Sequence, residues 1–283
     1  MIQVSTITEL RSYLKDKRRE NLTVGFVPTM GYLHEGHMSL IQAAKAQSNV
    51  VVMSIFVNPL QFGPNEDFDR YPRDIEHDRT LAEAAGVDFL FTPSVEEMYP
   101  RKMLTQVMVS QVSESLCGKS RPGHFDGVAT VVSKLFQIVQ PDKAFFGQKD
   151  AQQVAVIEQM VHDLSIPVEI VPCPIIREAD GLAKSSRNVY LKTDEREQAL
   201  VLNQSLQLAK ERIAKGEHST ETLVEIVKAT IAEKPLAQID YVELLKYPEL
   251  EVESELQTGE TYLLALAVKF GVTRLIDNVI ITI

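Results

Sequence analysis

The feature of this sequence that most constrains its fold is a regular alternation between short apolar runs and longer segments with helical periodicity. The alternation continues through the first 176 residues. Strands separated by helices of this length form βαβ units, whose strands lie parallel in one sheet. The expected strands are 23–28, 50–57, 87–91, 143–146 and 168–176, and the expected helices are 36–48, 73–85, 127–139 and 150–164.

The pattern changes after residue 176. Helical segments are followed there by β-rich runs, which is typical of a small α+β domain. We therefore predict an α/β chain: a Rossmann-like parallel-sheet domain over 1–176 and a smaller α+β lid domain over 177–283. The expected C-terminal elements are helices 194–215 and 219–233, the second with Ser219 as N-cap, and strands 239–245, 261–268 and 275–283.

Charge and composition narrow the partners. The chain has 29 Lys and Arg against 39 Asp and Glu, a formal net charge of −10. Binding to nucleic acid depends on neutralising phosphates with cations, so we expect no nucleic-acid partner. No apolar run approaches the roughly 18 residues that span a bilayer, and the N-terminus shows no signal-peptide pattern. Two cysteines, Cys117 and Cys173, fit a reducing compartment. We expect a cytoplasmic protein that does not bind membranes.

The strongest motif lies between an expected strand and an expected helix, at 28–37 (PTMGYLHEGH). Ligands of open α/β sheets bind at the carboxyl edge of the strands, and a helix N-terminus favours phosphate. His34 and His37 flank Gly36, so both can reach a phosphate chain, and imidazole can become cationic there. A metal site is an alternative, but the second histidine of HExxH and an obvious third ligand are lacking. Turn histidines without a function are the other alternative.

Two further segments carry cations that suit phosphate. In the first, Gly147 permits a tight turn, Lys149 supplies a charge, and Asp150 can accept from a ribose hydroxyl or cap the next helix. Lys184 and Arg187 flank two serines in the second, which could also be an exposed polar loop at a domain junction. We expect these segments and the histidine motif to surround one triphosphate.

Two residues elsewhere are more ambiguous. Gln61 follows the second expected strand, so it would lie at the same sheet edge, although a solvated loop glutamine is the alternative. His124, in the cationic turn 121–125, is interpreted as structural rather than catalytic.

Taken together, these segments resemble HIGH/KMSKS-type nucleotidyltransferases and, within that superfamily, the pantothenate synthetase family. The stretches that carry the resemblance occur in family order: 26–31, 54–59, 71–73, 121–125, 146–150 and 184–188. The resemblance implies an ATP-dependent ligase that condenses (R)-pantoate with β-alanine through a pantoyl adenylate, releasing AMP and pyrophosphate. It also implies Mg²⁺ as cofactor, with ATP as co-substrate, and a homodimer.

Individual roles also follow from the resemblance. The catalytic residues would be His37, as the acid/base group, with His34, Lys149 and Arg187. Gln61 and Gln153 would bind pantoate, and Gln61 would also neighbour β-alanine. Asp78 would lie near magnesium, because His77 stands where some members have a carboxylate. The ATP-binding residues would be Met30, Gly31, Tyr32, Leu33, His34, Glu35, Gly36, His37, Gly147, Gln148, Lys149, Asp150, Ile176, Lys184, Ser185, Ser186 and Arg187.

Three other functions are alternatives to this one. A nucleotidyltransferase acting on a phosphate ester would need more cations for its acceptor, whereas neutral glutamines suit a small hydroxy acid. A non-catalytic nucleotide sensor would bind ATP without releasing pyrophosphate. A relative of the aminoacyl-tRNA synthetases is disfavoured by the net charge and by the absence of an anticodon-binding extension.

Overall fold

The computed structural model describes residues 1–64 and 68–283 and contains two compact units. The first unit comprises 1–109, 121–148 and 156–174, and the second comprises 110–120, 149–155 and 175–283. This division differs from a single cut at residue 176, because two short earlier segments belong to the second unit. Each unit has its own sheet.

The first unit is built on a six-stranded sheet in the order β1-β4-β3-β2-β5-β6, in which every pairing is parallel. This confirms the predicted α/β, Rossmann-like sheet. β2 pairs with both β3 and β5, so successive strands are added on opposite sides of it. The carboxyl edge at this reversal is where ligands bind in open α/β sheets. The strands are β1 (Ile2–Val4), β2 (Val24–Thr29), β3 (Val50–Ile55), β4 (Phe89–Phe91), β5 (Lys143–Gly147) and β6 (Glu169–Cys173).

The helices of the first unit bury an apolar stripe against this sheet. α2, for example, buries Leu40, Ile41 and Ala44, which pack in one core with Val27 and Met53 of the strands. The short strand β1 and helix α1 were not predicted; α1 buries only Leu10 and Leu14, too narrow a stripe to stand out. The helices are α1 (Ile7–Arg19), α2 (Glu35–Gln47), η1 (Pro59–Gln61), α3 (Ile75–Ala84), α4 (Val95–Met98), α6 (His124–Val139), η2 (Gln148–Asp150) and α7 (Ala151–Asp163), the last two shared with the second unit.

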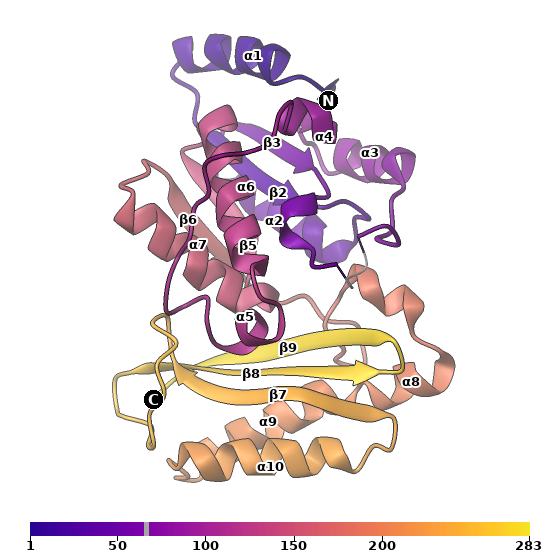
Figure 1. The fold of residues 1–283 in the computed structure, drawn as a ribbon, viewed down its shortest axis with the longest axis vertical. Helices are drawn as coiled ribbons and strands as arrows, with labels where there is room; N and C mark the ends of the chain where they lie inside the picture. Colours follow the sequence, from indigo (N-terminus) through magenta and orange to yellow (C-terminus); the bar gives the residue numbers. More distant parts are fainter. Residues whose placement is uncertain (65–67) are drawn as a thin grey trace. The chain divides into compact units, whose positions relative to one another are not determined.

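The second unit contains an antiparallel sheet in the order β7-β8-β9, with α9 and α10 covering one face (Figure 1). The core between them includes Leu206, Val227 and Leu264. This confirms the predicted α+β region. The elements are α5 (Leu116–Ser120), η3 (Ser186–Tyr190), α8 (Thr193–Gln198), α9 (Val201–Ala214), α10 (Thr220–Ala232), β7 (Ala237–Lys246), β8 (Thr261–Phe270) and β9 (Thr273–Thr282).

Two details of the second unit test the sequence predictions. Ser219 is the N-cap of α10, accepting a hydrogen bond from the Thr222 N–H at 3.2 Å, as predicted. The single helix expected over 194–215 is wrong, because α8 and α9 are separate. The backbone stays right-handed at Ala199, but the Leu202 N–H bonds the Ala199 carbonyl three residues back, which tightens the chain there. In the described part of the chain, no helix is long and apolar enough to cross a membrane.

Candidate active site

The histidine motif forms the turn between β2 and α2, at the carboxyl edge of the first unit's sheet. Gly31 and Tyr32 adopt positive φ angles of 86° and 51°. A Cβ at position 31 would lie 2.8 Å from Asp78 Oδ2 and 2.9 Å from Ile55 Cγ2. Only glycine therefore fits this point, because both the backbone conformation and the space exclude a side chain.

Asp78, on α3, holds this turn in place. Its carboxylate accepts hydrogen bonds from the Tyr32 N–H at 2.8 Å and the Leu33 N–H at 2.6 Å. Burial, with 2% of the residue exposed, raises the pKa of Asp78, and the two backbone hydrogen bonds oppose that shift. The residue therefore satisfies two N–H groups that the tight turn would otherwise leave without partners.

His34 and His37 cap the N-terminus of α2 with their own rings. The His34 Nδ1 atom accepts from the Gly36 N–H at 3.1 Å, and His37 Nδ1 accepts from the His34 N–H at 3.2 Å. The two ring centroids lie 4.2 Å apart. Because each Nδ1 accepts a hydrogen bond, the proton of a neutral ring sits on Nε2. Both rings thus offer an Nε2–H donor beside a helix N-terminus, where an anion is favoured.

Gln61, in η1, is buried next to this turn, with 8% of the residue exposed. Asn58 donates from Nδ2 to Gln61 Oε1 at 3.2 Å, which fixes the orientation of the amide. Gln61 Nε2 then lies 3.1 Å from the sulfur of Met30, a weak acceptor. Tyr99 holds Asn58 in turn, donating to its Oδ1 at 2.8 Å, and burial raises the pKa of Tyr99 so that it stays a donor.

Residues at the start of α6 contact η1, the segment that carries Gln61. His124 Nδ1 lies 2.8 Å from the Gln61 carbonyl oxygen, and its Nε2 lies 3.1 Å from Arg121 Nη1. Gly127 brings α6 against η1: a Cβ there would overlap the Leu60 carbonyl and come within 2.6 Å of Gln61 Cα. The structural interpretation of His124 agrees with these contacts. Sequence reasoning did not identify Asn58 and Tyr99; only the Asn-Pro pair after a strand could have pointed to Asn58.

The segment after β5 lies at the same sheet edge as the histidine turn. β5 is the direct neighbour of β2, with Ala144 opposite Phe26. Gly147 ends β5 and Gln148 follows it, both within the first unit. The structure therefore brings this segment to the carboxyl edge beside the turn that carries the two histidines.

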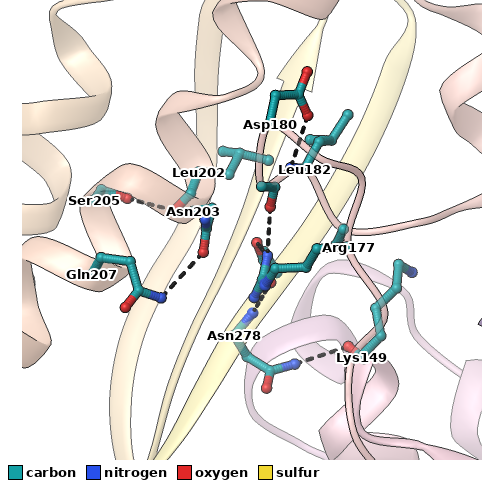
Figure 2. A network of polar contacts seen from close by, with 12 residues as sticks. Lys149, Arg177, Asp180, Leu182, Leu202, Asn203, Ser205, Gln207 and Asn278 are labelled. Carbon is teal, nitrogen blue, oxygen red and sulfur yellow. Dashed lines mark hydrogen bonds and ion pairs between the residues drawn. The ribbon is translucent and has the colours of Figure 1, made fainter.

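The second unit holds the remaining predicted residues. Lys149, 20% of whose side chain is exposed, has its Nζ 3.9 Å from Asp150 Oδ2. Its carbonyl oxygen accepts from Asn278 Nδ2 at 2.9 Å (Figure 2). Gln153 is half-buried on α7, whereas its neighbour Gln152 is buried and bonds the Val112 and Ser115 carbonyls.

The Lys184–Arg187 segment follows a short hairpin. The Lys184 N–H donates to the Ile176 carbonyl at 2.9 Å, so these two predicted ATP-binding positions are joined directly. Ser185 caps η3 by accepting from the Arg187 N–H at 3.3 Å. The cations expected to share one triphosphate therefore divide between the units, with the histidines in the first and Lys149, Lys184 and Arg187 in the second. Their convergence stays a prediction.

Magnesium has no dedicated protein site among the residues that the structure describes. They contain no group of three His, Cys, Asp or Glu side chains that could hold a metal ion. Both oxygens of Asp78, the expected magnesium neighbour, accept backbone hydrogen bonds. These residues do not fit a resident metal, and the approach of Asp78 to magnesium stays a prediction. Mg²⁺ commonly enters such sites bound to substrate phosphates.

Comparison with known proteins decides the family. A family model described as pantoate-beta-alanine ligase matches residues 2–280. The chain belongs to this family. The pantoate-beta-alanine ligase assignment confirms the resemblance seen in the motifs, and it makes the chain a ligase that forms pantothenate rather than a nucleotide sensor.

Relatives agree over nearly their full length. A pantothenate synthetase of Caldicellulosiruptor saccharolyticus is 56% identical over 283 residues, covering 100% of both chains. One of Geobacillus kaustophilus is 54% identical, covering 99% of this chain and 93% of its own.

Solved structures of the pantoate-beta-alanine ligase family share the fold. The pantothenate synthetase of Thermus thermophilus is 46% identical with a TM-score of 0.92, covering 99% of each chain. A pantoate-beta-alanine ligase of Francisella tularensis, complexed with β-γ ATP and β-alanine, is 36% identical with a TM-score of 0.79, covering 99% of this chain and 97% of its own.

Proposed function

We propose that this ligase activates pantoate with ATP as a pantoyl adenylate and then transfers the acyl group to β-alanine. The observation that carries the proposal is the pair of histidines that cap α2, His34 and His37, whose Nε2–H donors stand at the N-terminus of that helix. Gln61 lies beside the same turn, through its contact with Met30. An anion-binding helix end and a neutral amide thus stand together at the carboxyl edge of a parallel sheet.

The reaction has two steps. A pantoate carboxylate oxygen attacks the α-phosphorus of ATP, and the bond to the β-phosphate oxygen breaks, releasing pyrophosphate. The neutral amine of β-alanine then attacks the acyl carbon of the adenylate, loses a proton and displaces AMP. The products are pantothenate, AMP and pyrophosphate.

Negative charge develops on the phosphates in the first step, and donors aimed at them lower its barrier. His34 and His37 do so with Nε2, His37 being the acid/base group. We propose the same electrostatic role for Lys149, Lys184 and Arg187 because of their chemistry and the family resemblance. Loss of one well-placed donor costs about 3–4 kcal/mol in comparable sites. Mg²⁺ bound to the phosphates of ATP would supply further charge neutralisation.

ATP recognition uses both sheet-edge segments. The backbone of the turn from Met30 to Gly36 and the Gly147–Asp150 segment would contact the nucleotide, together with Ile176 and the serines of the 184–187 loop. The 184–188 loop closes over the nucleotide, because water would hydrolyse the adenylate.

Pantoate would be held by Gln61 and Gln153, and Gln61 would also neighbour β-alanine. The local contacts of Gln61 support this assignment. Asn58 donates to Gln61 Oε1, and Gln61 Nε2 contacts the sulfur of Met30, a weak acceptor, so we propose Nε2 as the group that binds the substrate. An oxygen of pantoate is a stronger acceptor and would replace it.

We further propose a homodimer that works in the cytoplasm, where the buried, unbridged Cys117 and Cys173 stay reduced.

The adenylate and the lysine can be tested together. Wild type with ATP and pantoate, without β-alanine, should yield a pantoyl adenylate by mass spectrometry and one equivalent of pyrophosphate. Lys149→Ala should slow pyrophosphate release by about 10²–10³-fold. Lys228→Ala is the control, since it removes an exposed lysine of the same unit. Lys149→Ala activity within a few-fold of wild type would remove Lys149 from the mechanism, and absence of the adenylate would overturn the two-step route.

A further inference from the structure

We infer that Asp277 and Asn278, neighbours on β9, are positioning residues for this reaction. They hold Lys149 and the loop that carries Lys184 and Arg187 in a fixed register within the second unit. The inference rests on the proposed function, because it assumes that those cations bind the phosphates of ATP.

Asn278 holds the backbone of Lys149. Its Nδ2 donates to the Lys149 carbonyl at 2.9 Å, across 129 positions of sequence (Figure 2). Only 5% of Asn278 is exposed, so the donor side of this partly buried bond is shielded from water. Lys149 lies in η2, a single short turn between β5 and α7. A fixed carbonyl there limits where the Lys149 ammonium can go.

Asp277 holds the hairpin before the other two cations. Arg177 donates to both carboxylate oxygens, at 2.7 and 2.9 Å, and its Nη1 also donates to the Gly181 carbonyl at 3.1 Å. The hairpin from Arg177 to Ala183 is thereby pinned to β9, and Lys184 follows immediately. Asp277 Oδ1 also accepts from the Asn278 N–H at 2.8 Å, so the two anchors are connected.

The alternation of side chains along β9 explains why one strand can serve both segments. Successive residues of a strand point to opposite faces of the sheet. Leu275 and Val279, two positions either side of Asp277, belong to the core that contains α9, so Asp277 lies on that face and Asn278 on the other. β9 pairs with β8 over ten residues, which makes it a rigid reference for segments on both sides.

The position of Asp277 argues for a role beyond stability. It is 1% exposed on an otherwise apolar stripe, where a carboxylate is costly unless paired, and an apolar residue would often be as stable. What a bidentate arginine–carboxylate pair adds is a fixed relative position of the two side chains. Catalysis needs that geometry, because a misplacement of about 1 Å can cost roughly 10²-fold in rate.

A double-mutant cycle tests the Asn278 arm. Asn278→Ala should lower the single-turnover rate of adenylate formation by about tenfold, less than Lys149→Ala, because it displaces the lysine without removing it. If Asn278 acts through Lys149, the double variant should be no slower than Lys149→Ala alone, within twofold. Asn278→Leu, which keeps the volume without the donor, serves if Asn278→Ala is poorly folded. Gln198→Ala is the matched control, because Gln198 is an amide with one backbone hydrogen bond elsewhere in the unit.

The Asp277 arm is tested in the same way. Asp277→Asn should raise the KM for ATP severalfold. If Asp277 acts through Arg187, the double variant should have the same KM for ATP as Arg187→Ala alone. The inference would be overturned if the losses of the single variants multiplied in both double variants. It would also be overturned if the single variants of Asn278 and Asp277 stayed within twofold of wild type. Either result would leave the proposed function intact. Failure of the proposed function has a different signature: Lys149→Ala itself would retain near wild-type pyrophosphate release, and the Asn278 arm would fall with it.

Discussion

The two sets of proposed phosphate-binding residues are held in place in different ways. In the first unit, His34 and His37 are fixed by hydrogen bonds within their own turn, spanning two or three residues, and Asp78 of α3 holds the turn through two backbone N–H groups. In the second unit, Lys149 depends on Asn278 and the 177–183 hairpin on Asp277, at separations of 129 and 100 residues. A helix end supplies its own geometry, whereas a cation on a long side chain needs a distant support. The free energy of unfolding should therefore fall less when a functional side chain of the first unit is removed than when an anchor of the second unit is removed.

The largest expected effect comes from breaking the distant anchor. Arg177→Ala leaves Asp277 buried without its partner, which should lower the free energy of unfolding by about 3–5 kcal/mol. Urea denaturation measures this, and Lys228→Ala, which breaks an exposed pair, should cost under about 1 kcal/mol. Equal effects of the two substitutions would mean that Asp277 does not depend on Arg177.

His37→Ala should separate function from stability in the first unit. Removal of its Nε2 donor should slow pyrophosphate release by about 10²-fold or more. Loss of the capping contact to the His34 N–H should cost only about 0.5–2 kcal/mol of stability. Calorimetry and single-turnover kinetics give both values, with His162→Ala, an exposed histidine, as control. A fall in thermal stability with unchanged adenylation would assign His37 a structural role alone.

Gly127→Ala should affect catalysis less than His37→Ala, and it sharpens the comparison because it tests a distant support within the first unit. The added methyl group meets the backbone of Leu60 and Gln61, so η1 must move. Overpacking of this kind costs about 1–3 kcal/mol. The KM for pantoate should rise more than the KM for ATP if Gln61 binds pantoate. Equal changes in both constants would argue that the displacement is not specific to Gln61.

Much of the fold could be predicted because its signals are local. The strand runs 50–57 and 143–146 and the helix 127–139 are dense in apolar residues, and they correspond to β3, β5 and α6. α1 and β1 were missed because a short strand and a helix with two buried leucines carry little periodic signal. The break between α8 and α9 falls at Ala199 and Leu200. Neither is a glycine or a proline, so the residue types did not indicate the break.

In the candidate site, too, the local features could be predicted and most of the distant contacts could not. The 28–37 motif marked a strand–helix turn, and the structure places one there with both histidines at the helix end. Asp78 was expected beside a metal on resemblance alone; its two backbone hydrogen bonds to the turn were not foreseen. Tyr99, Asp277 and Asn278 were not identified, since each acts through a contact far along the chain. Asn58 was not identified either, although the Gln61 amide that it orients is only three residues away.

The sequence by itself determined the parallel sheet, the α+β region, the family and the turn that places two histidines at a helix N-terminus. These follow from periodicity and from hydrogen bonds between residues a few positions apart. Only the tertiary structure decided which groups orient Gln61, what holds the Gly31 turn, and that adjacent residues of β9 support two separate cationic segments. Those choices depend on which faces of distant elements come into contact, and residue spacing along the chain does not encode that contact.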